Sequence, residues 1–319
     1  MSGPSSLRFG GLPVRRLASL LLAVALLVPA GAPRGQDMPA QGSELPAAAV
    51  SPVAALPDAS RFAAAEPQLQ HQLAADEMTY GPGHPAVAIR LSNLAFLLSN
   101  TERRSEAEPL YRRALAIFET SLGPDDPAVA TALSNFAILL QTDNRLNEAE
   151  PLLRRAVAIA ERTGGPDHPT VAVRLNNLAS LLQSANRLRE AEPLYRRALA
   201  IAEANGGPDH PAVAAGLSDL ARLLRSADRL SEAEPLFRRA LAINEKNGGP
   251  DHPDVAASLN DLAVLLHDTN RRAEAEPLLR RALAITEKSY GPDDPATRKV
   301  RRNLRMLQDK LAGSDAQVP

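Results

Sequence analysis

The sequence predicts an all-α protein made of repeated antiparallel helix pairs. A five-residue marker, Gly-Pro-(Asp/Gly)-(His/Asp)-Pro, recurs every 42 residues without an insertion. Between the markers, apolar residues recur at spacings of three and four in both halves of each unit, which is typical of amphipathic helices. A fixed internal period of this length indicates an array whose units pack on their neighbours. The markers begin at Gly81, Gly123, Gly165, Gly207, Gly249 and Gly291.

Each unit is predicted to hold two helices joined by a polar turn. In the first unit, Leu91, Leu94 and Leu98 lie on one side of the first helix. This helix begins near Pro85, where the missing N–H group of proline is not needed. After the polar residues 101–104, apolar residues resume at the same spacing and predict the second helix. A four-stranded blade of similar length is excluded because the helical period fills both halves of the unit.

Four histidines occupy one register of the marker, which raises the question of a metal site. Each lies in the turn of a different unit, so neighbouring histidines are separated by a helix layer about 10 Å thick. Zinc needs its ligands at about 2 Å from a single ion. Aspartate replaces histidine at Asp126 and Asp294, so we predict helix capping and no metal. The histidines are His84, His168, His210 and His252.

The composition excludes several classes of function. The chain has 36 Lys and Arg against 37 Asp and Glu, and this balance argues against a nucleic-acid binder. There is no cysteine, which excludes disulfides, thiolate metal sites and a cysteine nucleophile. The sequence holds no Gly-rich phosphate loop, no Gly-x-Ser-x-Gly and no His-Glu-x-x-His motif. We therefore predict a protein that is not an enzyme and uses no cofactor.

The N-terminal residues predict export. Arg15 and Arg16 precede an apolar stretch at 17–28, and small residues before Gly31 fit a signal-peptide cleavage site. The apolar stretch is shorter than the roughly 20 residues that span a bilayer comfortably. We expect a periplasmic or secreted protein without membrane insertion after signal cleavage. The alternative is a protein anchored in the membrane by an uncleaved signal.

The repeats define the organisation of the rest of the chain. The predicted segments are a signal peptide at 1–30, a disordered linker rich in Ala and Pro at 31–60, the repeat array at 61–311 and a disordered tail at 312–319. The predicted array consists of a half-repeat cap at 62–80, repeats at 81–122, 123–164, 165–206, 207–248 and 249–290, and a capping helix at 296–311. An alanine of every repeat becomes Arg305 in the last helix, which indicates that no further helix packs there.

Two blocks of the third repeat carry a family likeness. Its first half contains Leu-Asn-Asn-Leu-Ala-Ser-Leu-Leu at 175–182, and its second half contains Glu-Ala-Glu-Pro-Leu-Tyr-Arg-Arg-Ala-Leu-Ala-Ile at 190–201. These blocks closely resemble the 42-residue tetratricopeptide repeats of kinesin light chains, and similar arrays occur in many bacterial proteins. The resemblance implies a right-handed superhelical solenoid of antiparallel helix pairs. A motor role is not implied, because the chain lacks the heptad coiled coil through which a kinesin light chain joins its motor.

The resemblance also implies that the first helices line a concave groove that binds a peptide segment or partner protein. One groove register carries Asn or Asp throughout, and an Asn side chain can both donate to and accept from the backbone of an extended peptide. Alternatively, these residues cap or bridge neighbouring helices. Arg222 and Arg225 either bind a ligand carboxylate or neutralise Asp219, and Phe96 either anchors a ligand or packs on the front cap. The candidate groove residues are Asn93, Phe96, Asn135, Asn176, Asn177, Asp219, Arg222, Arg225, Asn260 and Asp261.

The second helices carry a row of paired arginines. We interpret this row as a solvated, salt-bridged face, because a Glu-Ala-Glu segment precedes each pair by one turn. The favoured function is therefore a non-catalytic scaffold that binds a protein in its groove. The alternative is a structural, self-assembling spacer of the cell envelope that uses its ends or its convex face. The pairs are Arg112-Arg113, Arg154-Arg155, Arg196-Arg197, Arg238-Arg239 and Arg280-Arg281.

Overall fold

The computed structural model of the chain describes residues 59–101 and 103–315. All regular elements in this part are α-helices, which confirms the predicted fold class. The predicted signal peptide at 1–30 and nearly all of the predicted linker at 31–60 lie outside the described residues, as do residues 316–319. No helix in the described part combines the length and apolar composition that crossing a membrane requires.

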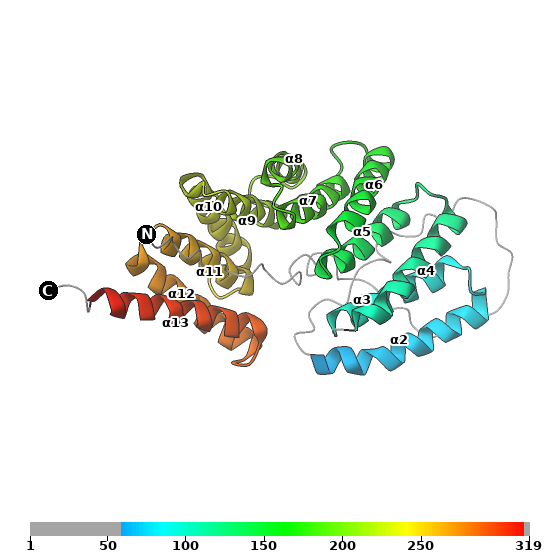
Figure 1. The fold of residues 1–319 in the computed structure, drawn as a ribbon, viewed down its shortest axis with the longest axis horizontal. Coiled ribbons are helices and arrows are strands. Elements are labelled where there is room, and N and C mark those ends of the chain that lie inside the picture. The colour runs from blue at the N-terminus through cyan, green and yellow to red at the C-terminus, as the bar shows by residue number, and fades with distance from the viewer. Residues whose placement is uncertain (1–58, 102, 316–319) are drawn as a thin grey trace, which may run out of the picture. The chain divides into compact units, whose positions relative to one another are not determined.

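The helices of the five full repeats alternate between two lengths. The first helix of a repeat has 16 residues and the second has 19. The first helices are α3 (Pro85–Asn100), α5 (Pro127–Thr142), α7 (Pro169–Ser184), α9 (Pro211–Ser226) and α11 (Pro253–Asp268). The second helices are α4 (Arg104–Leu122), α6 (Leu146–Gly164), α8 (Leu188–Gly206), α10 (Leu230–Gly248) and α12 (Arg272–Tyr290). Figure 1 shows these pairs in chain order.

Single helices precede and follow the five pairs. Helix α2 (Ala59–Tyr80) begins slightly before the predicted cap at 62–80. Helix α13 (Pro295–Asp315) extends past the predicted capping helix at 296–311 and into the predicted disordered tail at 312–319. The extension contains one glycine and no proline, and a single glycine weakens a helix by only about 1 kcal/mol relative to alanine.

The chain divides into two compact units. In its described part, the N-terminal unit consists of residues 59–124 and 138–144, and the C-terminal unit consists of residues 125–137 and 145–315. In the N-terminal unit, α3 packs between α2 and α4. In the C-terminal unit, each helix from α6 to α12 packs on the next one along the chain. In addition, α11 contacts both α9 and α13, so these helices lie side by side.

Backbone conformation explains why each helix ends where it does. The marker glycines that follow the second helices have φ between 80° and 91°, a region that L side chains rarely adopt. The turn between the two helices of a repeat uses Asn or Asp instead, at φ between 58° and 63°. Short polar side chains tolerate this left-handed conformation because they can hydrogen-bond locally. These residues are Asn144, Asn186, Asp228 and Asn270.

The marker histidines cap the first helices, as predicted. The backbone N–H of Ala86 donates to Nδ1 of His84 at 3.2 Å, and His168, His210 and His252 accept in the same way. Oδ1 of Asp126 accepts from the N–H of Ala128 at 2.8 Å. Histidine and aspartate therefore perform one capping role, in which each satisfies an N–H group that has no partner inside the helix. In the described part of the chain, no cluster of His, Asp and Glu side chains could hold a metal ion.

The core combines small residues at the helix contacts with larger side chains beside them. Within the C-terminal unit, Val213 and Leu217 of α9 pack with Ala240 and Ile243 of α10, and Leu199 of α8 packs on the same cluster. One first helix is thus held between the second helix of its own repeat and that of the preceding repeat. Ala95, Ala137, Ala179, Ala221 and Ala263 share one register and are completely buried, whereas Arg305 at that register is exposed.

Candidate functional site

One side of the first helices remains partly open to solvent, and we call it the first-helix face. In the C-terminal unit it comprises half-buried or paired polar residues of α7, α9 and α11, including Asn176, Asp219 and His267. Figure 1 shows α8 and α10 on the outer side of this unit and α7 and α9 on its inner side. Polar side chains on this face alternate with half-buried apolar ones such as Val173 and Val264.

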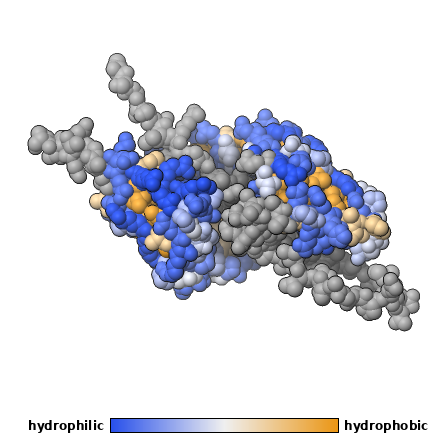
Figure 2. Space-filling view, turned by 90° about the horizontal axis from the view of Figure 1, so that it is seen from below, coloured by the Kyte–Doolittle hydropathy of each residue, from blue (hydrophilic) through white to orange (hydrophobic). Residues whose placement is uncertain are grey.

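The described surface offers little apolar area for recognition. The large hydrophobic residues that are exposed, Met78, Tyr80 and Tyr290, lie near the ends of α2 and α12 rather than on the first-helix face. On the side of the molecule drawn in Figure 2, hydrophobic residues form small separate patches among hydrophilic ones. Polar and charged side chains therefore make up most of the described surface on this side.

Hydrogen bonds between residues 43 positions apart join neighbouring first helices within the C-terminal unit. Nδ2 of Asn303 donates to Oδ1 of Asn260 at 2.8 Å. Nη2 of Arg174 donates to Oγ1 of Thr131 at 2.7 Å. The contact from Gln183 to Ser226 is long, at 3.5 Å, and is correspondingly weak. Some first-helix residues therefore bridge neighbouring helices, which is the alternative role that the sequence analysis allowed for the groove residues.

The Asn and Asp side chains that share one register of the first helices differ in whether they have hydrogen-bond partners. Asn303 bridges to the preceding repeat, and Asp219 pairs with Arg222 on its own helix. Asn177 is 1% exposed, yet neither Oδ1 nor Nδ2 has a hydrogen-bond partner. Asn135 is half-buried and its amide makes no hydrogen bond within the described residues. Asn93 of the first repeat is also half-buried without a hydrogen bond within the described residues, so free amides occur in the first three repeats and the buried one is Asn177.

The remaining candidate residues occupy varied surroundings. Asn93 and Phe96 are both half-buried on α3 in the N-terminal unit. Asn176 is half-buried on α7, and its Oδ1 is enclosed without a partner. Asn260 and Asp261 are buried on α11, where Nδ2 of Asn260 donates to Oδ1 of Asp261 at 3.3 Å.

Arg222 and Arg225 are neutralised by carboxylates of the protein itself. Nη2 of Arg222 donates to Oδ1 of Asp219, and its guanidinium lies 3.9 Å from Asp261. Burial lowers the pKa of Arg222, but the charges of these two carboxylates outweigh it and raise the pKa overall. Arg225 pairs with Asp268 at 3.4 Å. Of the two roles that the sequence allowed for Arg222, the structure shows the neutralising one.

Sequence reasoning missed Arg174, a buried arginine of α7 that forms no ion pair with a carboxylate. It is 7% exposed, and Nη2 reaches Thr131, but Nε and Nη1 are enclosed without a partner. Burial lowers the pKa of this guanidinium to about 10, so it still carries its charge at neutral pH. Arg174 lies outside the registers that the resemblance assigns to the groove. Comparing the residues that the repeats carry at the position of Arg174 could have identified this arginine from the sequence.

The outer side of the second helices carries a lattice of arginine and glutamate pairs, as predicted. The first arginine of each pair contacts the glutamate one turn earlier, as Arg196 does with Glu192 at 2.8 Å. In four of the five pairs the second arginine reaches the helix pair before its own, as Arg197 does with Glu161 at 2.6 Å. Its guanidinium also donates to the carbonyl oxygen of Pro166 at 2.9 Å. The row is therefore a structural lattice that joins successive repeats.

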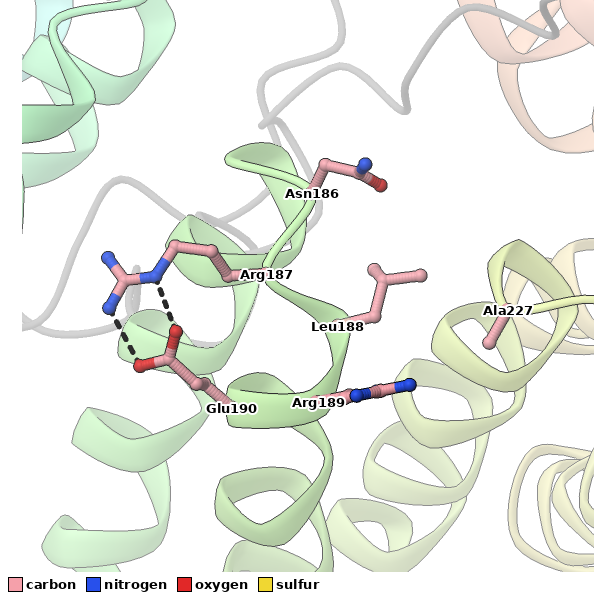
Figure 3. A pocket seen from close by; sticks show the side chains of 6 residues that line it. All are labelled: Asn186, Arg187, Leu188, Arg189, Glu190 and Ala227. Atoms are coloured by element: carbon pink, nitrogen blue, oxygen red, sulfur yellow. Dashed lines mark hydrogen bonds and ion pairs between the residues drawn. The ribbon is translucent and has the colours of Figure 1, made fainter.

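The arginine before each second helix extends this lattice. Nε and Nη2 of Arg187 donate to both carboxylate oxygens of Glu190 at 2.7 Å, and Nη1 donates to Glu150 of the preceding repeat. Arg229 and Arg271 repeat this arrangement. Arg187 and Glu190 also form one side of a shallow surface pocket between Asn186 and Ala227 (Figure 3). Among the residues that line the pocket, Glu190 is the one carboxylate, and it is paired with Arg187.

The lattice predicts a loss of stability in acid. Hydrogen bonds from Arg187 lower the pKa of Glu150 below its usual 4.5, and hydrogen bonds from Arg238 and Arg271 lower that of Glu234. A carboxylate whose pKa is lower in the folded state stabilises the protein fully above the unfolded pKa and progressively less as the pH falls through the folded one. Thermal unfolding should therefore show a midpoint that is constant near neutral pH and falls by several degrees below about pH 4.5.

A double variant separates this effect from general acid unfolding. Glu150→Gln with Glu234→Gln should unfold at a lower temperature than the wild type at pH 7, and its midpoint should fall less on acidification. Parallel pH profiles for the two proteins would show that these glutamates do not contribute the acid sensitivity.

The repeat pattern and the fold agree with comparisons to known proteins. The tetratricopeptide repeat family matches the chain at residues 58–120, 91–162, 128–204, 176–246 and 229–288. The chain belongs to the tetratricopeptide repeat family. Proteins of this family are generally non-catalytic scaffolds, and the fold commonly mediates protein–protein interaction. A search of curated proteins finds no match to this chain.

Comparison with solved structures indicates which type of tetratricopeptide repeat the chain contains. Nearly identical repeats of a kinesin light chain from Podosopora anserina are 28% identical, cover 65% of this chain and 98% of theirs, and give a TM-score of 0.55. BtubC (BKLC) from P. vanneervenii is 24% identical, with coverage of 73% and 91% and a TM-score of 0.57. A Rap protein in complex with competence and sporulation factor is 17% identical, with coverage of 80% and 72% and a TM-score of 0.53. The repeats are therefore of the kinesin light chain-like type.

Proposed function

We propose that this protein is a non-catalytic scaffold that holds a segment of a partner protein on its first-helix face, after export. The observation that supports this most directly is the set of free amides at Asn135, Asn176 and Asn177. Buried polar groups in folded proteins are nearly always hydrogen-bonded, yet both amide atoms of Asn177 and the enclosed Oδ1 of Asn176 have no partner, and the half-buried Asn135 makes no hydrogen bond within the described residues. The backbone of an extended segment carries both donors and acceptors, so it can satisfy such amides whatever its side chains.

The competing proposal places function on the outer side, as a spacer that assembles through its ends or its second helices. The outer arginines are already paired with glutamates of the same chain, so they offer few free donors to another molecule. The Rap protein shares the fold and is solved with competence and sporulation factor bound, but at 17% identity that likeness concerns the fold alone. The free amides of this chain therefore carry the proposal.

A peptide-display experiment tests the proposal. A library of random 12-residue peptides would be selected against the wild type, and the affinity of the selected peptides measured by calorimetry for Asn135→Ala with Asn177→Ala. Each lost hydrogen bond to a neutral group costs about 0.5–1.5 kcal/mol, so binding should weaken by roughly fivefold to a hundredfold. Circular dichroism should show that the double variant keeps its helical content.

The matched control lies on the outer side. Arg196→Ala with Arg197→Ala removes two side chains of the arginine and glutamate lattice and should leave peptide affinity unchanged. If the asparagine variant binds normally and the arginine variant does not, the binding face is the outer one. Sedimentation of the wild type checks the spacer alternative, which requires self-association that the arginine variant lacks.

A further inference from the structure

Positive charge is concentrated on α13, the last helix of the C-terminal unit. This helix has six basic residues against two acidic ones. The whole chain has 36 basic and 37 acidic residues, so the part outside α13 is acidic overall. Helix α13 packs on α12 and contacts α11, and its other sides meet no further helix (Figure 1). The basic residues are Arg298, Lys299, Arg301, Arg302, Arg305 and Lys310.

Three of these residues form a row on the outer side of α13, which we call the arginine stripe. Arg298, Arg302 and Arg305 are exposed, and their spacings of four and three residues place them on one side of the helix. Val300 and Leu304 are buried on the other side. The side chains of the three arginines form no hydrogen bond or ion pair with other described residues.

The arginine stripe differs in this respect from its surroundings. On the same helix, Nη2 of Arg301 donates to Oε1 of Glu287 at 2.7 Å, and Nη1 donates to the carbonyl oxygen of Pro292 at 3.0 Å. The first arginines of the second-helix pairs are bound to glutamates of their own helices, as Arg196 is to Glu192. The stripe therefore keeps all of its side-chain donors for another molecule.

Solubility of the end of the array does not by itself require these charges. A terminal repeat needs a polar outer face. Helix α2, the cap at the other end, exposes Gln68, Gln70 and Ala74, which are uncharged. Neutral side chains are therefore sufficient to cap the array, and the three arginines of α13 exceed what a cap needs.

A second copy of the chain offers no free negative charge at its opposite end. The acidic residues of α2 are already paired with arginines that follow them in the chain. They are Glu66, Asp76 and Glu77, and their partners are Arg103, Arg90 and Arg113 respectively. Head-to-tail stacking of copies would thus bring the arginine stripe against carboxylates that are neutralised.

The surroundings of the stripe also differ from those of a protein interface. The centre of such an interface is apolar and rich in aromatic residues. Between residues 295 and 310 no large hydrophobic side chain is exposed. Attachment to an anionic bilayer needs no apolar centre, because each basic side chain near the headgroups contributes its own electrostatic attraction.

We propose that the arginine stripe attaches this protein to an anionic membrane surface by binding phospholipid phosphates. A guanidinium matches two phosphate oxygens, and clusters of about four to eight basic residues are typical of segments that bind anionic lipids. Helix α13 stays at the headgroups, because its apolar side is already packed on α12. This inference does not depend on whether a partner segment binds the first-helix face.

Cosedimentation of the full chain with lipid vesicles tests the inference. The wild type should bind vesicles of phosphatidylglycerol and phosphatidylcholine more strongly than vesicles of phosphatidylcholine alone, and added salt should weaken the difference. Each arginine near an anionic surface strengthens binding by about fivefold. The triple variant Arg298→Gln, Arg302→Gln and Arg305→Gln should therefore bind anionic vesicles about a hundredfold more weakly.

A second triple variant removes the same net charge elsewhere. Arg196→Gln, Arg238→Gln and Arg280→Gln change exposed arginines that are paired with glutamates, and this variant should bind anionic vesicles as the wild type does. Phosphatidylcholine vesicles report any binding through the apolar stretch at 17–28, which all three proteins share. Equal losses for the two triple variants would show that net charge alone governs binding and that the stripe is not a site.

An acidic peptide distinguishes a lipid surface from a protein partner. A peptide of about ten glutamates offers negative charge without phosphate or a bilayer. Stripe-dependent binding to this peptide, with no preference for anionic over neutral vesicles, would assign the stripe to an acidic protein and overturn the inference. The thermal midpoint of the stripe variant should equal that of the wild type, because the replaced side chains are exposed and unpaired.

Discussion

Replacing Ala221 with arginine is expected to disrupt the C-terminal unit. Ala221 is completely buried where α9 meets its neighbours, as is the alanine of every repeat at this register. An arginine there must either bury an uncompensated charge or force the helices apart, and such changes cost about 4 kcal/mol or more. Circular dichroism should show lost helical content or a thermal transition that occurs at a much lower temperature.

The same register at the end of the array provides the control. Arg305 is exposed, so Arg305→Ala should change the free energy of unfolding by no more than about 0.5 kcal/mol. A variant Ala221→Arg that melts like the wild type would mean that the helices around Ala221 do not pack closely enough to exclude a long side chain.

Replacing Phe237 with alanine is expected to have the second large effect. Phe237 on α10 is 1% exposed, and truncating a buried aromatic side chain costs about 3–5 kcal/mol through lost burial and the cavity that remains. Since each repeat contacts only its neighbours, the damage should be local. Urea unfolding followed by circular dichroism should show part of the helical signal lost at a lower urea concentration than in the wild type.

A leucine variant distinguishes lost volume from lost aromaticity. Leu153 and Leu279 occupy the register of Phe237 in two other repeats and are equally buried. Phe237→Leu should therefore cost no more than about 1.5 kcal/mol, as expected of an apolar exchange that a core can repack around. Equal losses for the alanine and leucine variants would show that the ring itself, rather than the filled volume, stabilises this repeat.

The local structure of the repeats could be predicted because its causes lie close together in the chain. The apolar spacing around Leu94 and Leu98 defines one buried side of a helix. His84 caps the helix that begins at the very next residue, and Gly81 supplies the positive φ that ends the helix before it. Each of these effects acts within a few residues, so the sequence contains all the information that they need.

The candidate site was less predictable from sequence. The family resemblance predicted which positions lie on the first-helix face. It did not predict which of their side chains are paired and which are free. Arg222 and Arg174 are both arginines on first helices, yet Asp219 and Asp261 neutralise one of them, while the other faces Ala160. Nothing in the local sequence around Arg174 distinguishes it from a residue that is paired.

The sequence by itself determined the helical period, the caps, the turns and the membership of a repeat family. Only the tertiary structure decided which charges are neutralised and which polar groups remain free. The physical reason is distance along the chain, because Arg197 meets its glutamate 36 residues earlier and Arg174 meets Thr131 43 residues earlier. Hydrogen bonds and direct ion pairs form only when the two groups lie within a few ångströms, and the packing of successive repeats determines which distant residues come that close.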